Sequence, residues 1–197
     1  MKIDLWNTVL DAHRALLDQV RESLFPHCEL LVGVLVDTMK SGRKLLVMGN
    51  GGSAADAQHI ATEFVVRLQG DRGPLPAIAL TTDTSTLTAA GNDYGFEEIF
   101  ARQVQALARE GDVVIGISTS GNSENVLRGL KAARALGAVT AALTGGDGGK
   151  LRDLADHVIV VPSRSTARIQ EMHILIGHLL VGAVEQDLGM VAENHDH

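Results

Sequence analysis

Several residue types are scarce in the sequence, and each shortage excludes a class of structure. A single cysteine, Cys28, in 197 residues rules out an intramolecular disulfide framework and any zinc cluster built from cysteines. Any metal site must therefore use His, Glu, Asp or Gln ligands. The aromatic residues are limited to one Trp, one Tyr and four Phe, so the core must be built from Val, Leu, Ile and Ala, which suits buried parallel strands.

Positive charge and long apolar runs are also scarce. The chain carries 17 Lys and Arg against 24 Asp and Glu, a net charge of −7, whereas binding to nucleic acid or anionic membranes usually needs a basic surface. The most apolar stretch, 172–184, is shorter than the ~20 residues that span a bilayer. Asp4 and Asp11 interrupt any run that resembles a signal peptide. We expect a cytoplasmic protein without direct nucleic-acid or membrane contact.

The order of hydrophobic patterns predicts an α/β fold. Apolar residues have helical spacing at 3–24 and 29–39, and from Lys44 onward short apolar runs alternate with helical segments. These runs predict parallel strands at 44–48, 77–80, 113–117, 139–143 and 157–161. We expect a three-layer αβα sandwich of flavodoxin/Rossmann type with a five-stranded parallel sheet, preceded by N-terminal helices. One domain, 1–197, would comprise assembly helices (1–42), the α/β core (43–190) and a disordered tail (191–197).

A glycine-rich loop follows the first predicted strand. Gly49-Asn50-Gly51-Gly52-Ser53 leads into a helix, and such a loop lets the backbone approach an anionic or polar ligand at the helix N-terminus. Two alternatives stay open. The spacing imitates a dinucleotide-binding fingerprint, although the acidic residue expected ~20 positions later is absent. The glycines could also form a purely structural turn.

Hydroxyl side chains are concentrated after the third predicted strand. Ser118, Thr119, Ser120 and Ser123 occupy four of six positions before a helix, next to Gly121. Side-chain hydroxyls and backbone N–H groups at a helix N-terminus can together bind a phosphate. The alternative is an ordinary helix N-cap, which needs one hydroxyl and leaves three unexplained.

Candidate acid–base or metal-binding residues lie on two predicted helices. His59 and Glu63 are four residues apart and project from one helix face, a spacing that suits a metal site or a proton-transfer pair. The alternative is a solvent-exposed stripe in which Glu63 pairs with Arg67, worth only ~0.3–0.5 kcal/mol. His178 lies in the apolar last helix, where it is either a functional residue or a core histidine with a satisfied hydrogen bond.

Four separated segments resemble the sugar isomerase (SIS) family of phosphosugar-binding domains, and within it the enzymes that isomerise sedoheptulose 7-phosphate. The segments are GNGGSAADAQHIATEF (49–64), LTTDTSTLTAAGNDYGFEEIFARQV (80–104), GISTSGNSENVL (116–127) and RIQEMHILIGH (168–178). Several motifs in the right order are more specific than any one of them.

The resemblance implies a cytoplasmic homotetramer that converts sedoheptulose 7-phosphate into D-glycero-D-manno-heptose 7-phosphate, the first step of nucleotide-activated heptose synthesis for lipopolysaccharide. It also implies one zinc ion per subunit, bound by His59, Glu63, Gln170 and His178, of which Glu63 and His178 match the family's proton-transfer residues. The substrate contacts that it implies are Asn50, Gly51, Gly52, Glu63, Asn92, Asp93, Ser118, Thr119, Ser120, Ser123 and Gln170.

The implied roles agree with the chemistry, except at one point of geometry. Isomerisation through an enediol needs a base and an acid, for which Glu63 and His178 are suitable. Gln170 and His178, however, are eight residues apart, or ~12 Å on a straight helix, which is awkward for two ligands of one ion. A bent helix start or a site shared between subunits would resolve this.

A binding protein of the same family is the main alternative. The DnaA initiator-associating protein, a tetramer with no isomerase role, resembles this chain at STARIQEMH (165–173). It lacks the acid–base positions, whereas Glu63 and His178 are both present here, which favours the enzyme. A phosphosugar-sensing regulator would need a fused DNA-binding segment, and the 43 residues before the first predicted strand leave little room for one.

Overall fold

The computed structural model describes residues 2–191, and it confirms the α/β fold with a five-stranded parallel sheet. Except for Val191, the predicted tail lies outside these residues. The strand order is β2-β1-β3-β4-β5. The strands are β1 (Leu45–Gly49), β2 (Ala77–Ala79), β3 (Val113–Ser118), β4 (Val139–Gly145) and β5 (His157–Val161), close to their predicted ranges.

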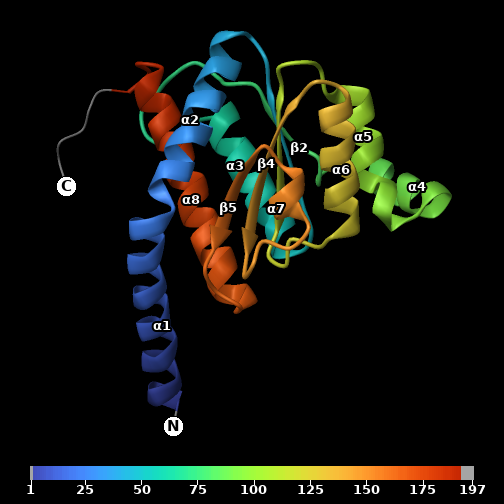
Figure 1. Ribbon diagram of the computed structural model, residues 1–197. Helices are drawn as coiled ribbons and strands as arrows, with labels where there is room; N and C mark the ends of the chain where they lie inside the picture. The colour runs from blue at the N-terminus through green and yellow to red at the C-terminus, as the bar shows by residue number, and fades with distance from the viewer. Residues whose placement is uncertain (1, 192–197) are drawn as a thin grey trace.

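Helices cover both faces of the sheet (Figure 1). One face carries α2 (Phe25–Lys40), α3 (Gly52–Val65) and α8 (Thr166–Asp187), with α1 (Lys2–Ser23) extending beyond it. The other face carries α4 (Thr84–Tyr94), the 3₁₀ turn η1 (Phe96–Glu98), α5 (Ile99–Leu107), α6 (Glu124–Ala135) and α7 (Leu151–Leu154). Two hydrophobic cores result, one on each side of the sheet.

The strand sequences supply both cores because successive side chains point to opposite faces. Leu45 and Val47 of β1 pack with α2, α3 and α8, whereas Leu46 and Met48 pack with α5 and α6. All four are fully buried, and this is why the strands appear as continuous apolar runs in the sequence.

The N-terminal helices differ from each other in burial. The second helix begins at Phe25, earlier than the predicted start at 29, with Pro26 in its first turn, where proline is well tolerated. Its Leu35 is completely buried against the sheet. Helix α1 projects from the body and leaves Ile3 and Trp6 more than 60% exposed. The assembly role of residues 1–42 and the proposed domain division stay predictions.

Helices α3 and α8 lie side by side, and their contact positions the candidate site. Gly177 of α8 packs against Ile60 of α3 so closely that a Cβ atom on Gly177 would lie 2.8 Å from Ile60 Cγ1. Within residues 2–191, no helix is both long and apolar enough to cross a bilayer.

Candidate active site

The contact between α3 and α8 brings three predicted residues together. The Oε1 atom of Glu63 lies 3.0 Å from His59 Nε2 and 3.2 Å from His178 Nε2. The two histidine Nε2 atoms are 3.1 Å apart. Glu63 and His178, which are 115 positions apart in the sequence, therefore meet within one chain. We refer to His59, Glu63 and His178 as the acid–base centre.

The acid–base centre combines a buried carboxylate with open histidines. The side chain of Glu63 is 11% exposed, and those of His59 and His178 are 52% and 39% exposed. Arg67 donates to the carbonyl of Gln69 rather than to Glu63, so the solvent-exposed stripe is not formed. The second oxygen of Glu63, Oε2, is buried and has no hydrogen-bond partner among the described residues. A bound substrate or ion would supply the partner that this oxygen lacks.

The same three residues fit a divalent metal ion. Their ligand atoms all lie within 4.8 Å of one another. Two imidazole nitrogens and a carboxylate oxygen form a donor set that zinc accepts, and three protein ligands leave a coordination position open. The unpartnered Oε2 of Glu63 adds a further donor atom.

Gln170 lies elsewhere on α8. A Cβ atom on Gly52 would lie 2.6 Å from Gln170 Nε2, so the absence of a side chain at Gly52 makes room for this amide at the start of α3. Because α8 is one continuous α-helix from Thr166 to Asp187, Gln170 and His178 are about 12 Å apart along it. Within one chain, the structure does not bring Gln170 to the other three proposed ligands.

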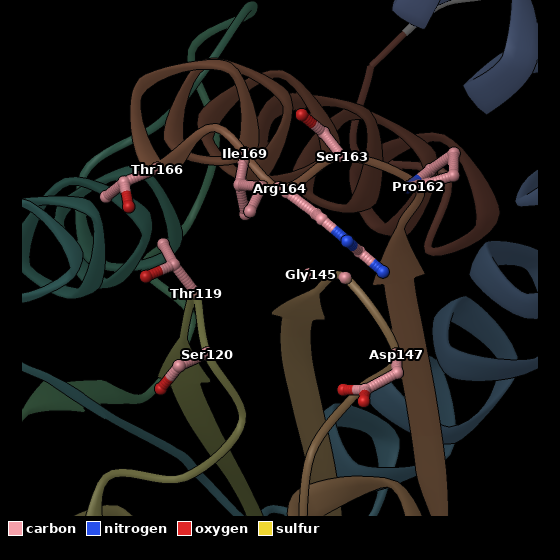
Figure 2. Close-up of a pocket in the computed structure, with 10 residues that line it drawn as sticks. Thr119, Ser120, Gly145, Asp147, Pro162, Ser163, Arg164, Thr166 and Ile169 are labelled. Carbon is pink, nitrogen blue, oxygen red and sulfur yellow. The ribbon is translucent and has the colours of Figure 1, made fainter.

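The hydroxyl-rich motif lies at the carboxyl end of the sheet, beside an open pocket of about 590 Å³ (Figure 2). We refer to it as the hydroxyl pocket. It is formed by the loops after β3, β4 and β5 and by the start of α8, as expected for ligand sites of parallel sheets. Its lining residues are Thr119, Ser120, Gly145, Gly146, Asp147, Pro162, Ser163, Arg164, Thr166 and Ile169.

The hydroxyl of Ser123 does not cap α6, although Ser123 occupies the N-cap position. Its Oγ atom instead lies 2.9 Å from Ser118 Oγ. Asn50 and Asn125 exchange two amide hydrogen bonds of 2.9 and 2.8 Å, which tie the glycine loop to the first turn of α6. The two predicted binding motifs are therefore adjacent, and no side-chain hydroxyl within residues 2–191 forms the ordinary N-cap that was the alternative for this motif.

The remaining predicted substrate contacts lie apart from the hydroxyl pocket. Asn50 and Gly51 line a second pocket of about 440 Å³ between the glycine loop and α4. Asn92 and Asp93 are exposed near the end of α4, where the Asn92 amide donates to the Asp93 carboxylate at 2.7 Å. Neither of these two residues lines the hydroxyl pocket.

Three residues near these sites were not among the predicted site residues. The side chain of Arg164 extends across the hydroxyl pocket in Figure 2. Its position shortly after a predicted parallel strand could have indicated a ligand contact, because ligands bind at the carboxyl ends of such strands. Asn125 is buried and pairs with Asn50. His173 is fully buried on α8, and its Nε2–H donates to the Thr144 carbonyl at 3.1 Å, beneath the pocket. Burial lowers the pKa of His173 to about 4, so the ring stays neutral at pH 7.

Comparisons with known proteins identify the family of the chain. The SIS-domain family model matches residues 10–145. The phosphoheptose isomerase of Aquifex aeolicus is 62% identical over 156 residues, covering 79% of this chain and 82% of the relative. The phosphoheptose isomerase of Geobacter metallireducens is 55% identical, covering 92% and 96%.

A solved structure leads to the same family. The structure of a phosphoheptose isomerase from Francisella tularensis superposes with a TM-score of 0.92 at 40% identity, covering 94% of this chain and 99% of the other. The chain therefore belongs to the SIS-domain proteins and, within them, to the phosphoheptose isomerase family.

Proposed function

We propose that the chain converts sedoheptulose 7-phosphate into D-glycero-D-manno-heptose 7-phosphate by proton transfer through an enediol. The observation that carries this proposal is the 3.2 Å separation between Glu63 Oε1 and His178 Nε2. A base and an acid at hydrogen-bonding distance can serve adjacent carbon and oxygen atoms of one substrate. The initiator-associating alternative does not require this pair.

The proposed reaction moves one proton between neighbouring carbons. Glu63 removes a proton from C1 of the ketose while the His178 ring donates a proton to the C2 carbonyl oxygen, which gives the 1,2-enediol. The proton on Glu63 exchanges with solvent while the enediol is bound, and Glu63 then donates a proton to C2 while the His178 ring takes the proton of the C1 hydroxyl, which gives the aldose. Positioned acid–base groups typically contribute ~10²–10⁴-fold.

We propose that the hydroxyl pocket binds the substrate phosphate. The hydroxyls of Ser120 and Thr119 line the pocket, and Ser118 and Ser123 are adjacent to it. Arg164 would add positive charge on the same side. Anchoring the phosphate would hold the reacting carbons in place and lower the entropic cost of the reaction. Asn50, Gly51, Gly52, Asn92, Asp93 and Gln170 complete the proposed set of substrate contacts.

We also propose one zinc ion per subunit, held by His59, Glu63 and His178. When bound, the ion would polarise the carbonyl or a hydroxyl of the substrate. The ~12 Å between Gln170 and His178 favours a site in which Gln170 acts on a neighbouring subunit. Elemental analysis of metal-replete protein should find about one zinc per chain, and His59→Ala should lower this content. Zinc-free wild-type protein would contradict the proposed site.

The proposed assembly is a cytoplasmic homotetramer. Exposed apolar side chains on α1 support an interface there, because large apolar patches of this kind usually mark contact surfaces. They are Ile3, Leu5, Trp6, Val9 and Leu10. The mass measured by light scattering should be four times the chain mass of 20.9 kDa.

Incubation with sedoheptulose 7-phosphate tests the function. We expect NMR signals of D-glycero-D-manno-heptose 7-phosphate to appear with time in the presence of the purified protein. Protein that is folded, metal-replete and unable to form this product would contradict the proposal. Binding to purified DnaA without turnover would favour the initiator-associating class instead.

A further inference from the structure

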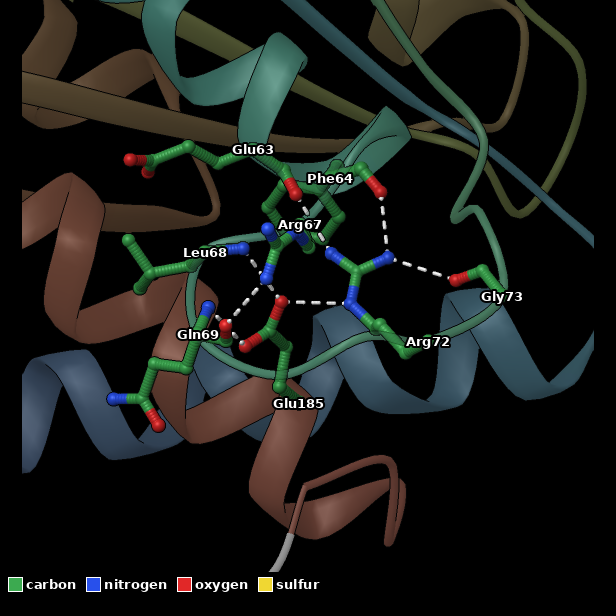
Figure 3. A network of polar contacts seen from close by, with 8 residues as sticks. All are labelled: Glu63, Phe64, Arg67, Leu68, Gln69, Arg72, Gly73 and Glu185. Carbon is green, nitrogen blue, oxygen red and sulfur yellow. Dashed lines mark hydrogen bonds and ion pairs between the residues drawn. The ribbon is translucent and has the colours of Figure 1, made fainter.

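A buried ion pair lies at the end of α3, beside the backbone of Glu63 (Figure 3). The Nε atom of Arg72 is 2.6 Å from Glu185 Oε1, and the two side chains are 1% and 0% exposed. Removing two charges from water is costly unless further hydrogen bonds satisfy both groups. The further hydrogen-bond partners of Arg72 and Glu185 therefore show which segments of the chain the ion pair connects.

The remaining Arg72 donors bind backbone carbonyls. Its Nη2 atom donates to the Glu63 carbonyl at 2.6 Å, and its Nη1 atom donates to the carbonyls of Phe64 and Gly73 at 2.9 and 2.8 Å. Glu63 and Phe64 belong to the last turn of α3, where carbonyls lack partners within the helix and the helix dipole favours a cation. The guanidinium thus holds the backbone of Glu63 itself.

Glu185 connects this end of α3 to α8. It lies seven residues after His178, about two turns further along the same helix face. Its carboxylate also accepts from the backbone N–H groups of Leu68 and Gln69, at 2.9 and 3.4 Å. The ion pair therefore joins the helix that carries His178 to the backbone of Glu63 and to the loop after it.

We propose that Arg72 and Glu185 are positioning residues that set the separation between Glu63 and His178. The inference rests on the proposed function, since it assigns these residues a role in the same proton transfer. The close contact of Gly177 with Ile60 fixes how near the helices approach, and the ion pair fixes how far along each other they lie. A displacement of ~1 Å at a reacting group can reduce turnover ~10²-fold.

The test removes both charges together, because Arg72→Met with Glu185→Leu leaves no unpaired buried charge. The double variant still removes the donor of the Glu63, Phe64 and Gly73 carbonyls, which costs stability, so thermal unfolding is measured alongside the kinetics. We expect kcat to fall at least tenfold in the double variant, with KM for sedoheptulose 7-phosphate within about twofold of wild type.

The matched control is Lys44→Met with Asp112→Leu. This pair is also close, at 2.6 Å, with Asp112 buried, but its hydrogen bonds join Lys44, Asp112 and the Arg109 backbone and involve neither α3 nor α8. We expect this control to lose stability without a selective loss of kcat. Equal losses of kcat in the two double variants would overturn the positioning role.

If the double variant does not fold, Arg72→Lys tests the positioning role of Arg72. Lysine keeps the charge but lacks the planar fork that reaches several carbonyls at once. We expect a smaller fall in kcat at unchanged KM, and unchanged kcat would overturn the proposal.

Crystal structures of the variants separate this inference from the proposed function. An increase in the Glu63–His178 separation would support the positioning role, and an unchanged separation would contradict it, whatever the activity. Wild-type protein with no isomerase activity would contradict the proposed function directly.

Discussion

The acid–base centre and the hydroxyl pocket are built in different ways, although α8 contributes to both. The acid–base centre uses side chains from two packed helices, and a single chain brings His59, Glu63 and His178 together. The hydroxyl pocket uses loops at the ends of three strands and is open. Under the proposed function, helix packing would set the geometry of the reaction, whereas strand ends and loops would supply the donors that anchor the substrate.

Two histidines on α8 differ in burial. His178 is partly exposed and faces Glu63, whereas His173 is fully buried and bonded to the carbonyl of Thr144. The core-histidine interpretation that the sequence allowed for His178 therefore describes His173. Of the two, His178 has the environment suited to proton exchange with a substrate.

Glu63→Gln should have the largest effect, and it acts on the acid–base centre alone. We expect kcat to fall by about 10²–10⁴-fold, because the amide cannot accept the C1 proton, while the oligomer mass stays close to that of wild type. Steady-state kinetics and light scattering would measure both. Near-normal kcat would remove Glu63 from the mechanism.

Acid should weaken the fold through His173. Since its pKa is lowered from 6.5 to about 4 in the folded protein, the unfolded chain binds more protons between these values. The free energy of unfolding should therefore fall as the pH decreases from about 6.5 to about 4, by up to ~1.4 kcal/mol per pH unit. Urea titrations at several pH values measure this slope, and an undiminished slope in His173→Gln would assign it to other groups.

Gly177→Ala should disturb the α3–α8 contact. The new Cβ atom would meet the buried Ile60 at 2.8 Å, so overpacking should lower the free energy of unfolding by about 1–3 kcal/mol and reduce kcat. Gly182→Ala on the same helix is the control, since its Cβ would lie an ordinary 3.6 Å from Leu68 Cδ2. Equal behaviour of the two variants in thermal unfolding and kinetics would contradict the role of the close contact.

Ser120→Ala with Ser123→Ala should affect the hydroxyl pocket alone. Loss of two hydroxyls that bind a charged phosphate should raise KM about tenfold or more with a smaller change in kcat. Ser85→Ala, on the exposed face of α4, is the matched control. An unchanged KM would place the phosphate in another pocket.

The sequence predicts regular features better than distances between helices. The strands were predictable because buried parallel strands are continuous apolar runs, and the SIS motifs identified Glu63 and His178. The 3.2 Å separation of these residues depends on how α3 packs on α8, and no local pattern encodes that packing. Arg72 and Glu185 were missed for the same reason, since a charged residue in a polar loop and one near a helix end look exposed in sequence.

Solvent deuterium incorporation tests the proton transfer between Glu63 and His178 most directly. Wild-type protein supplied with sedoheptulose 7-phosphate in deuterated buffer should form D-glycero-D-manno-heptose 7-phosphate that carries deuterium at C2, and Glu63→Gln should slow this incorporation by about 10²–10⁴-fold. Product that forms at the wild-type rate with no deuterium at C2, or incorporation that persists unchanged in Glu63→Gln, would contradict the account.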